Sequence, residues 1–153
     1  MNCSIGQVSK VMNYLLDNAW VEKRKEGYGL IDPESLLQEW SRVYGKKDLP
    51  AYGCYSLDNV SALENKLVQL KKNHGIDTYL TGFSGGVRYA PAVRYNKVHV
   101  YISPENIREA IDFLGMKEVD SGSNVVIYSL ENDCYMKDFR VIDGMAVVSP
   151  VQI

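Results

Sequence analysis

The fold of the N-terminal part is decided by residues 4–31, whose sequence is SIGQVSKVMNYLLDNAWVEKRKEGYGLI. Apolar residues recur in the first half at the three- and four-residue spacing of a helix with one apolar face: Ile5, Val8, Val11, Met12, Leu15 and Ala19. Ser4 suits the N-cap of this helix, because its hydroxyl can accept a hydrogen bond from a free backbone N–H of the first turn. Residues 20–30 form two short runs around a charged tip, with glycine in the returning run, which predicts a hairpin.

The opposite face of this helix is expected to carry side chains that donate and accept hydrogen bonds: Gln7, Ser9, Lys10 and Asn13. A helix of this kind can enter the major groove and contact base edges. The tip of the hairpin is basic, with Lys23, Arg24 and Lys25, and can hold phosphates. Helix and hairpin together resemble the recognition helix and wing of a winged helix-turn-helix DNA-binding domain. The alternative is a solvated surface helix followed by an ordinary charged hairpin.

The composition is that of a soluble globular protein of one ordinary domain or two very small ones, with 153 residues, 46% hydrophobic and 24% charged. A net charge of −2 argues against a chain coated in nucleic acid, but it is compatible with a local basic face. We therefore expect any DNA affinity of this chain to be modest and salt-sensitive.

Cysteine usage and hydropathy indicate a cytoplasmic protein. Cys3, Cys54 and Cys134 are far apart, without a CxxC pair or histidines at metal-ligand spacing, so we expect reduced thiols and neither a disulfide framework nor a zinc site. No apolar run approaches the roughly 20 residues that span a bilayer, and the first residues lack the pattern of a signal peptide. We expect no membrane partner.

The chain is expected to divide after a second helix. Asp32-Pro33-Glu34 is a typical helix start, with Asp as N-cap and Pro in the first position, and this helix should end near Gly45. Residues 46–50 look like a linker. Residues 1–45 would then form a partial winged helix, and residues 50–153 a second domain.

The second domain alternates strands and helices. Strands are predicted at residues 52–57, 76–81, 97–102 and 125–130, and an Asp143-Gly144 hairpin at 141–148. One helix should start at Asp58 and end at Gly75, another should start at Ser103 and end at Gly115, and residues 82–86 should form a turn. The predicted class is α+β: a partial winged helix-turn-helix followed by a small α/β domain with a mixed sheet flanked by helices.

Five motifs give the chain a wider resemblance: GQVSKV at 6–11, IDPE at 31–34, GFS at 82–84, SGSNVV at 121–126 and VVSPVQ at 147–152. In this order they resemble the AbiEi-type antitoxin family of type IV toxin–antitoxin systems, along nearly the whole chain. The resemblance implies a winged helix joined to an α/β C-terminal domain, in a regulator that represses its own operon. It also implies two partners, operator DNA and a nucleotidyltransferase-like toxin that the antitoxin need not bind directly.

Compared with that family, the chain is expected to be truncated at both ends. Only three residues precede Ser4, where a winged helix has two further helices, and family members continue past the VSPVQ motif. The apolar face of the first helix would then pack on the C-terminal domain or on a second copy, in a homodimer.

Enzymatic interpretations find little support. Residues 82–86 match the G-x-S-x-G pattern of a serine hydrolase, but the one histidine that follows, His99, lies within a predicted strand. The alternative is a glycine-rich turn in which Ser84 caps a short helix. No Gly-Ser pair is followed by the paired carboxylates of a nucleotidyltransferase. A solvated turn is favoured over a metal site for Glu131, Asp133 and Asp138. We expect His74 and His99 to be structural, and no catalytic residue, metal or cofactor.

A basic and aromatic cluster flanks Pro91 and consists of Arg88, Tyr89, Arg94, Tyr95 and Lys97. Its cations can hold phosphates and its tyrosines can stack on bases, which makes Arg88, Arg94 and Lys97 further DNA-contact candidates. The alternative is a basic loop that packs its tyrosines on the edge of the sheet.

The hypothesis is a DNA-binding transcriptional autoregulator. The main alternative is a protein-interaction or dimerisation module without DNA binding, and a small-molecule sensor is a third, for which no ligand signature is present. Salt separates the first two, because phosphate contacts release counterions and apolar docking does not.

Overall fold

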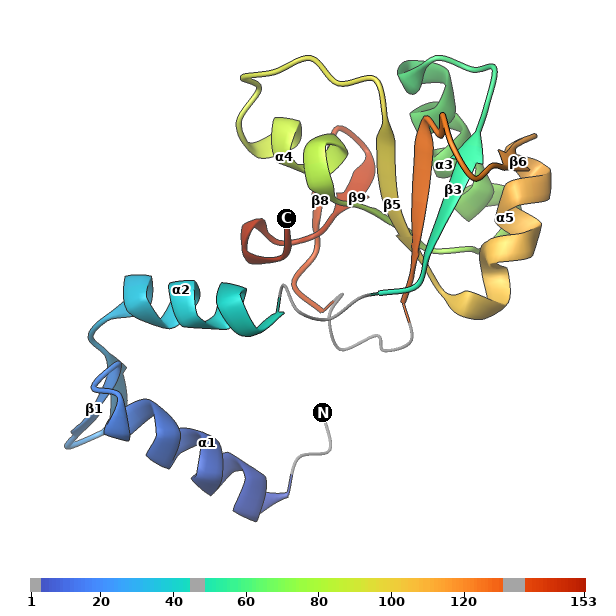
Figure 1. Ribbon diagram of the computed structural model, residues 1–153. Helices are drawn as coiled ribbons and strands as arrows, with labels where there is room; N and C mark the ends of the chain where they lie inside the picture. The colour runs from blue at the N-terminus through green and yellow to red at the C-terminus, as the bar shows by residue number, and fades with distance from the viewer. Residues whose placement is uncertain (1–3, 45–48, 131–136) are drawn as a thin grey trace. The chain divides into compact units, whose positions relative to one another are not determined.

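The computed structural model describes residues 4–44, 49–130 and 137–153 (Figure 1). The chain forms two compact units, Met1–Asp48 (unit 1) and Leu49–Ile153 (unit 2). Over the described residues, helices combine with a two-stranded and a seven-stranded sheet, so the predicted α+β class is confirmed. Among these residues there is no helix long and apolar enough to cross a membrane.

Unit 1 is a helix, a hairpin and a second helix. Its elements are α1 (Ile5–Asp17), β1 (Val21–Arg24), β2 (Gly27–Leu30) and α2 (Pro33–Tyr44). The predicted cap of α1 is confirmed: Ser4 Oγ accepts from the backbone N–H of Gln7 at 3.2 Å, and the Gln7 side chain accepts in return from the backbone of Ser4. At the start of α2, Asp32 Oδ1 accepts from the Ser35 N–H at 3.0 Å, as the sequence predicts.

A tight reversal joins α1 to the hairpin. The N–H of Trp20 donates to the Leu15 carbonyl at 3.1 Å and that of Ala19 to the Leu16 carbonyl at 2.9 Å. This is the hydrogen-bond pattern that closes many helices on a residue in the left-handed conformation, usually glycine. Here that residue is Ala19, with φ of 55°. The chain therefore turns directly from α1 into β1.

Unit 2 contains a mixed sheet. Its strands are β3 (Ala51–Tyr55), β4 (Thr78–Leu80), β5 (Val98–Ile102), β6 (Lys117–Glu118), β7 (Val125–Ser129), β8 (Arg140–Ile142) and β9 (Met145–Val147). Their order is β6-β3-β7-β5-β4-β9-β8. The β5–β7 and β4–β9 pairs are parallel and the others are antiparallel. The last pair, β8 and β9, is the predicted hairpin, with Asp143 and Gly144 at φ of 50° and 78°.

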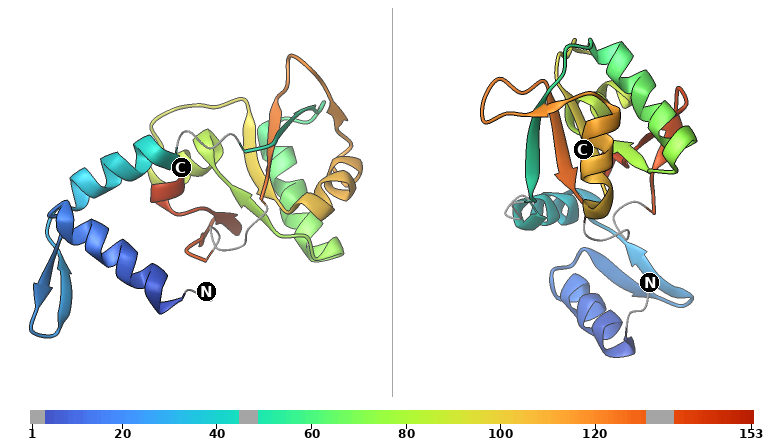
Figure 2. Two further views of the ribbon diagram at one scale, coloured as in Figure 1. Left: turned by 60° about the horizontal axis from the view of Figure 1, so that its bottom comes forward. Right: turned by 90° about the vertical axis from the view of Figure 1, so that its right-hand side faces the viewer.

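Two helices pack on the main core of unit 2. These are α3 (Val60–His74) and α5 (Ile107–Phe113), the latter preceded by the 3₁₀ turn η1 (Pro104–Asn106). Their apolar sides pack with alternate residues of β5 and β7 in one cluster, so both helices cover the same face of the sheet (Figures 1 and 2). The cluster includes Leu63, Leu67, Leu70, Val98, Val100, Ile102, Ile111, Leu114, Val125, Ile127 and Val147.

A row of tyrosines crosses the other face of the sheet. Tyr79, Tyr101 and Tyr128 lie opposite one another on the adjacent strands β4, β5 and β7. Tyr101 is buried with Leu130 and Val148 in a second, smaller cluster. The strands are thus apolar on both faces, which fits their near-continuous hydrophobic sequences.

Two local predictions for unit 2 are wrong, and one strand was missed. The N-cap of α3 is Asn59 and not Asp58: Asn59 Oδ1 accepts from the Ala62 N–H at 2.9 Å, while Asp58 forms an ion pair with Lys66. Residues 82–86 are not a turn, because they form the first part of helix α4 (Gly82–Tyr89). Strand β6 was not predicted, since two charged residues carry no strand pattern.

The glycines of α4 serve close packing. A Cβ on Gly82 would lie 2.6 Å from His99 Nδ1, and one on Gly85 would lie 3.0 Å from the Leu80 carbonyl oxygen. Gly82 also has φ of +52°, a conformation that other residues rarely adopt. The glycine-rich motif therefore lets a helix start directly at the end of β4 and lie against β5.

Candidate nucleic-acid interface

The predicted base-contacting residues all lie on α1 and are exposed: Gln7, Ser9, Lys10 and Asn13. Gln7 differs from the others, because its side-chain oxygen accepts from the Ser4 N–H at 3.3 Å and so completes the cap of the helix. Its amide nitrogen remains a donor. The exposed side of α1 therefore offers a hydroxyl, an ammonium and two carboxamides along about two turns of helix.

The predicted phosphate contacts lie at the tip of the hairpin. Lys23, Arg24 and Lys25 are exposed, and Lys25-Glu26 form the two-residue turn between the strands. Arg24 Nε donates to Glu22 Oε1 at 2.8 Å. The Arg24 guanidinium also lies over the returning strand, since a Cβ on Gly29 would be 2.2 Å from Arg24 Cζ. Gly29 thus leaves the room in which Arg24 lies flat across the hairpin.

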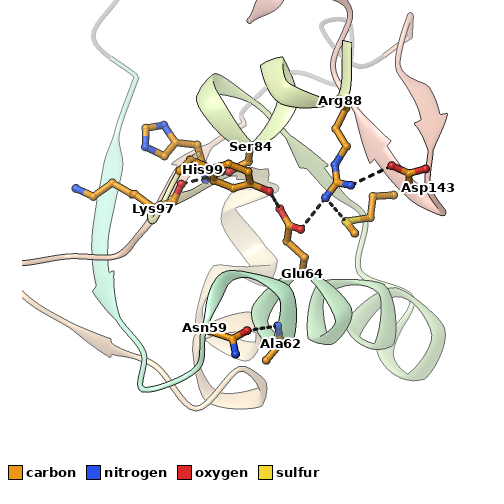
Figure 3. Close-up of polar contacts among 10 residues, drawn as sticks. Asn59, Ala62, Glu64, Ser84, Arg88, Lys97, His99 and Asp143 are labelled. Carbon is orange, nitrogen blue, oxygen red and sulfur yellow. Dashed lines mark hydrogen bonds and ion pairs between the residues drawn. The ribbon is translucent and has the colours of Figure 1, made fainter. Parts of the chain in front are cut away.

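The remaining candidates, Arg88, Arg94 and Lys97, belong to unit 2. Arg94 is exposed, whereas Lys97 is half-buried and its Nζ donates to Ser123 Oγ at 3.1 Å. Arg88 points into the unit (Figure 3). Its side chain is 13% exposed, and its guanidinium binds Glu64 Oε2 at 2.6 Å and Asp143 Oδ2 at 3.2 Å. These contacts occupy Arg88, so we leave it out of the DNA surface proposed below.

Glu64 is the centre of a buried polar network. It comes from the middle of α3, is 6% exposed, and accepts from Arg88 of α4 and from the Tyr95 hydroxyl at 2.5 Å (Figure 3). Burial raises the pKa of Tyr95 to about 12, and the hydrogen bond to Glu64 acts in the same direction. Burial lowers the pKa of Arg88, but the charge of Glu64 and its hydrogen bond outweigh this, so the net shift is upward. Both groups keep their protons.

The network joins four segments of unit 2. Arg88 links α3 and α4 to Asp143 in the β8–β9 turn, and Tyr95 adds the loop before β5. Tyr89 contributes separately, because its hydroxyl donates to the Val148 carbonyl at 2.8 Å. Sequence reasoning missed Glu64, although a signal was present: it falls within the apolar stripe of α3, four residues after Val60 and three before Leu67. A carboxylate in such a stripe requires a buried cation.

Ser84 is fully buried inside α4 and has a structural role. Its Oγ accepts from the His99 N–H at 2.9 Å and donates to the Lys97 carbonyl at 3.4 Å (Figure 3). These two backbone groups lie at the edge of β5 that faces β4. They have no partner on β4, because β4 has already ended and the chain has turned into α4. Ser84 therefore neither caps a helix nor has the exposed hydroxyl of a nucleophile elbow.

The two histidines have structural contacts. His99 lies beside Gly82 and Tyr128, and burial, followed by the nearby charge of Lys97, lowers its pKa below the ordinary value. His74 Nδ1 lies 2.6 Å from Glu109 Oε1, and its ring packs edge-on against Phe113. Each ring thus contacts a neighbouring element of unit 2.

Metal-ligating groups do not cluster in the part of the chain that the structure describes: no three His, Cys, Asp or Glu side chains there lie close enough to hold an ion. Glu131, Asp133, Cys3 and Cys134 fall outside the described residues, and Asp138 is exposed. Cys54 is a free thiol in the core, and burial raises its pKa.

Comparison with known proteins supplies the family. The family model of AbiEi antitoxins, transcriptional regulators of type IV toxin–antitoxin systems, matches residues 29–153. The chain belongs to this family. The predicted resemblance is thereby confirmed, over α2 and the whole of unit 2. Searches of curated proteins and of solved structures found no match.

Membership in the AbiEi family gives the protein a general role. The family consists of transcriptional regulators that act as antitoxins. The match begins at Gly29, so it includes part of the hairpin, while α1 and the basic tip lie before it.

Proposed function

We propose that this AbiEi-family protein is a DNA-binding autoregulator that represses its own toxin–antitoxin operon in the cytoplasm. One observation carries the proposal: unit 1 presents the polar side of α1 and the basic tip of an adjoining hairpin, both exposed. This is the pairing of a recognition helix with a wing. The chain's membership in a family of transcriptional regulators supports the same assignment.

The two elements have different tasks in this proposal. Ser9, Lys10 and Asn13 contact base edges in the major groove, where a carboxamide can pair with adenine in two hydrogen bonds. Lys23, Arg24 and Lys25 hold phosphates and set the register of the protein on the duplex. Gln7 supports the helix through its cap and adds a donor. Arg94 and Lys97 of unit 2 are weaker, flanking contacts.

Operator DNA and a toxin are the partners that the family suggests, and the exposed apolar face of α1 suggests a second copy of the chain. The protein counters a nucleotidyltransferase-like toxin encoded beside it, without a requirement for direct contact, and acts as a homodimer on operator DNA. No cofactor enters this mechanism, since sequence-specific binding needs only hydrogen bonds and charge.

Fluorescence anisotropy tests the proposal. The full chain is titrated onto a labelled duplex from immediately upstream of its own gene and, in parallel, onto a scrambled duplex, each at 50 mM and 200 mM salt. Binding that is stronger to the upstream duplex than to the scrambled one, and that weakens steeply with salt, is expected. Equal weak binding to both duplexes, or none, would refute operator recognition.

A second function has support from one specific observation. Unit 1 contains a mainly apolar hollow between α1 and α2, lined by Tyr14, Trp20, Leu36, Leu37, Glu39, Trp40 and Val43. An interaction module would use this hollow to bind a protein, and its affinity would be nearly independent of salt. The anisotropy titration is repeated with a labelled partner protein in place of DNA, at the same two salt concentrations. Affinity that does not change with salt would support the interaction module.

A further inference from the structure

Unit 1 buries very little apolar surface. Within residues 4–43, whose burial the structure describes, Trp20 and Val21 are the only buried apolar side chains, and α1 buries no residue at all. Units of this size rarely fold on their own without a disulfide, a metal or association with another chain. No metal cluster is present among the described residues, and the one cysteine described, Cys54, lies in unit 2. Association with another chain would supply the apolar burial that the described part of unit 1 lacks.

The exposed apolar surface has two complementary parts. A ridge runs along α1 and consists of Ile5, Val8 and Val11, which are 90%, 52% and 56% exposed. The groove is the hollow of about 470 Å³ between α1 and α2 described above, with Tyr14, Trp20 and Trp40 among its lining residues. Ridge and groove adjoin on one unit, because Val11 and Tyr14 are neighbours on consecutive turns of α1.

We propose that a second copy of this chain covers this surface, with the ridge of each copy inserted in the groove of the other. Two-fold symmetry limits this arrangement to two copies, since the ridge of each copy fills the groove of the other. Ridge and groove together comprise nine apolar or aromatic side chains. Trp20 is buried within the unit, and the other eight suit the core of an interface of about 800 Å² per partner. Residues 4–44 carry nearly equal numbers of acidic and basic side chains, so two copies do not repel.

The dimer extends the proposed function, on which its consequence for the operator rests. Val8 and Lys10 point about 160° apart around the helix axis, so α1 can contact a second copy and DNA at once. Two-fold symmetry then presents two copies of the base-contacting face. The expected operator is an inverted repeat whose half-sites are separated by about one helical turn or a multiple of it.

The association is tested on the full chain without DNA. Light scattering coupled to size exclusion should give twice the chain mass of 17.3 kDa, falling to one chain on dilution. The chain's two tryptophans, Trp20 and Trp40, both line the groove. Trp40 is 37% exposed and Trp20 only 9%, so the change in fluorescence on covering the groove should come mainly from Trp40. Emission should shift to longer wavelength, and acrylamide quenching should increase, over the same dilution range as the change in mass.

Two substitutions locate the interface. Val8→Glu places a charge on the ridge and should give a monomer with red-shifted tryptophan emission at every concentration. Leu57→Glu is the matched control, because Leu57 is an equally apolar side chain, 94% exposed, in unit 2. It should leave both mass and emission unchanged. The circular dichroism of both variants shows whether α1 remains folded.

The outcomes decide the inference separately from DNA binding. A wild-type monomer at all concentrations overturns it, as does a dimer that Val8→Glu leaves intact. A monomer whose tryptophans are already protected from acrylamide would mean that another part of the same chain covers the groove, which also overturns it. A dimer that binds no operator would instead refute the proposed function and leave the interface standing.

Discussion

Glu64 and Arg88 form a buried ion pair that ties α3 to α4, with side chains only 6% and 13% exposed. Removing one partner leaves the other charge buried without compensation, which is far more destabilising than the loss of a surface pair. We predict that Glu64→Ala lowers the free energy of unfolding by about 3–5 kcal/mol, measured by urea denaturation followed by circular dichroism. Asp143→Asn is the control: Asp143 is 73% exposed, and its loss should cost less than about 1 kcal/mol.

Ala19 is strained for a different reason, since it occupies the left-handed position that closes α1. A Cβ in that conformation costs roughly 1–2 kcal/mol, and glycine avoids this cost. Ala19→Gly should therefore stabilise unit 1 by about 1 kcal/mol, visible as slower amide exchange in α1. Asn18→Gly, one position earlier and at negative φ, should give no such gain. Equal exchange in wild type and Ala19→Gly would contradict the strain.

His99 gives the stability of unit 2 a pH dependence. Burial and the charge of Lys97 hold its pKa in the folded chain below the ordinary value of about 6.5. The unfolded chain therefore takes up the proton first, so stability is complete above pH 6.5 and falls as the pH is lowered. NMR titration of the ring protons should show His99 titrating below 6.5, with His74→Gln identifying the signal. His99→Gln should flatten the fall in thermal stability on the acid side.

At the scale of elements, α1 and the hairpin should respond differently to mutation. Asn13→Ala removes a base contact on α1 and should weaken operator binding by roughly 1–3 kcal/mol, with little effect on scrambled DNA. Anisotropy with both duplexes measures the difference. Equal loss on both would place Asn13 outside the groove.

Lys25→Ala is the matched comparison on the hairpin. A phosphate contact carries no sequence information, so its removal should weaken both duplexes alike and reduce the slope of log affinity against log salt by about 1. A selective loss on the operator would assign Lys25 to base contact instead.

The sequence was enough to predict helices whose end residues cap them locally, by a side-chain hydrogen bond or by a left-handed glycine. Ser4 and Asp32 cap their helices as expected, and Gly75 closes α3 at φ of 70°. The start of α4 could not be predicted in this way, because glycines at 82, 85 and 86 have low helix propensity. Their value lies in close approach to other segments: Gly82 to His99 of β5, and Gly85 to the end of β4 at Leu80. Asn59 was missed since Asp58, its neighbour, is an equally good cap until its ion pair with Lys66 is known.

The candidate site was predictable only where it is local. The residues of α1 and the hairpin tip lie within 20 positions of one another, and periodicity is enough to place them on one exposed surface. Arg88 has the same sequence character as Arg94, yet one is buried against Glu64 and the other is exposed. That difference depends on the pairing of α3 with α4, 24 residues apart, and no local pattern reveals it.

At the scale of the whole molecule, unit 2 should be an independent folding unit. Both of its apolar clusters consist entirely of residues from position 49 onward. We predict that a fragment of residues 49–153 unfolds in one cooperative thermal transition, measured by circular dichroism, and keeps the shifted titration of His99. Residues 1–48 alone, with two buried apolar side chains in their described part, should show no such transition. A non-cooperative melt of the larger fragment would contradict this division.

The position of β9 has a consequence for the folding of the protein during its synthesis on the ribosome. This strand pairs with β4 on one side and β8 on the other, and Val147 and Val148 are fully buried. A ribosome adds residues in order, so β4 can pair with β5 early, while its other neighbour, β9, is made about 65 residues after β4. A domain completes its fold only when all of its segments have emerged. The regulator therefore cannot complete its larger unit while position 147 is still inside the exit tunnel. A message cut short before that codon yields a nascent chain with an open sheet edge, a form suited to quality-control proteases and not to repression.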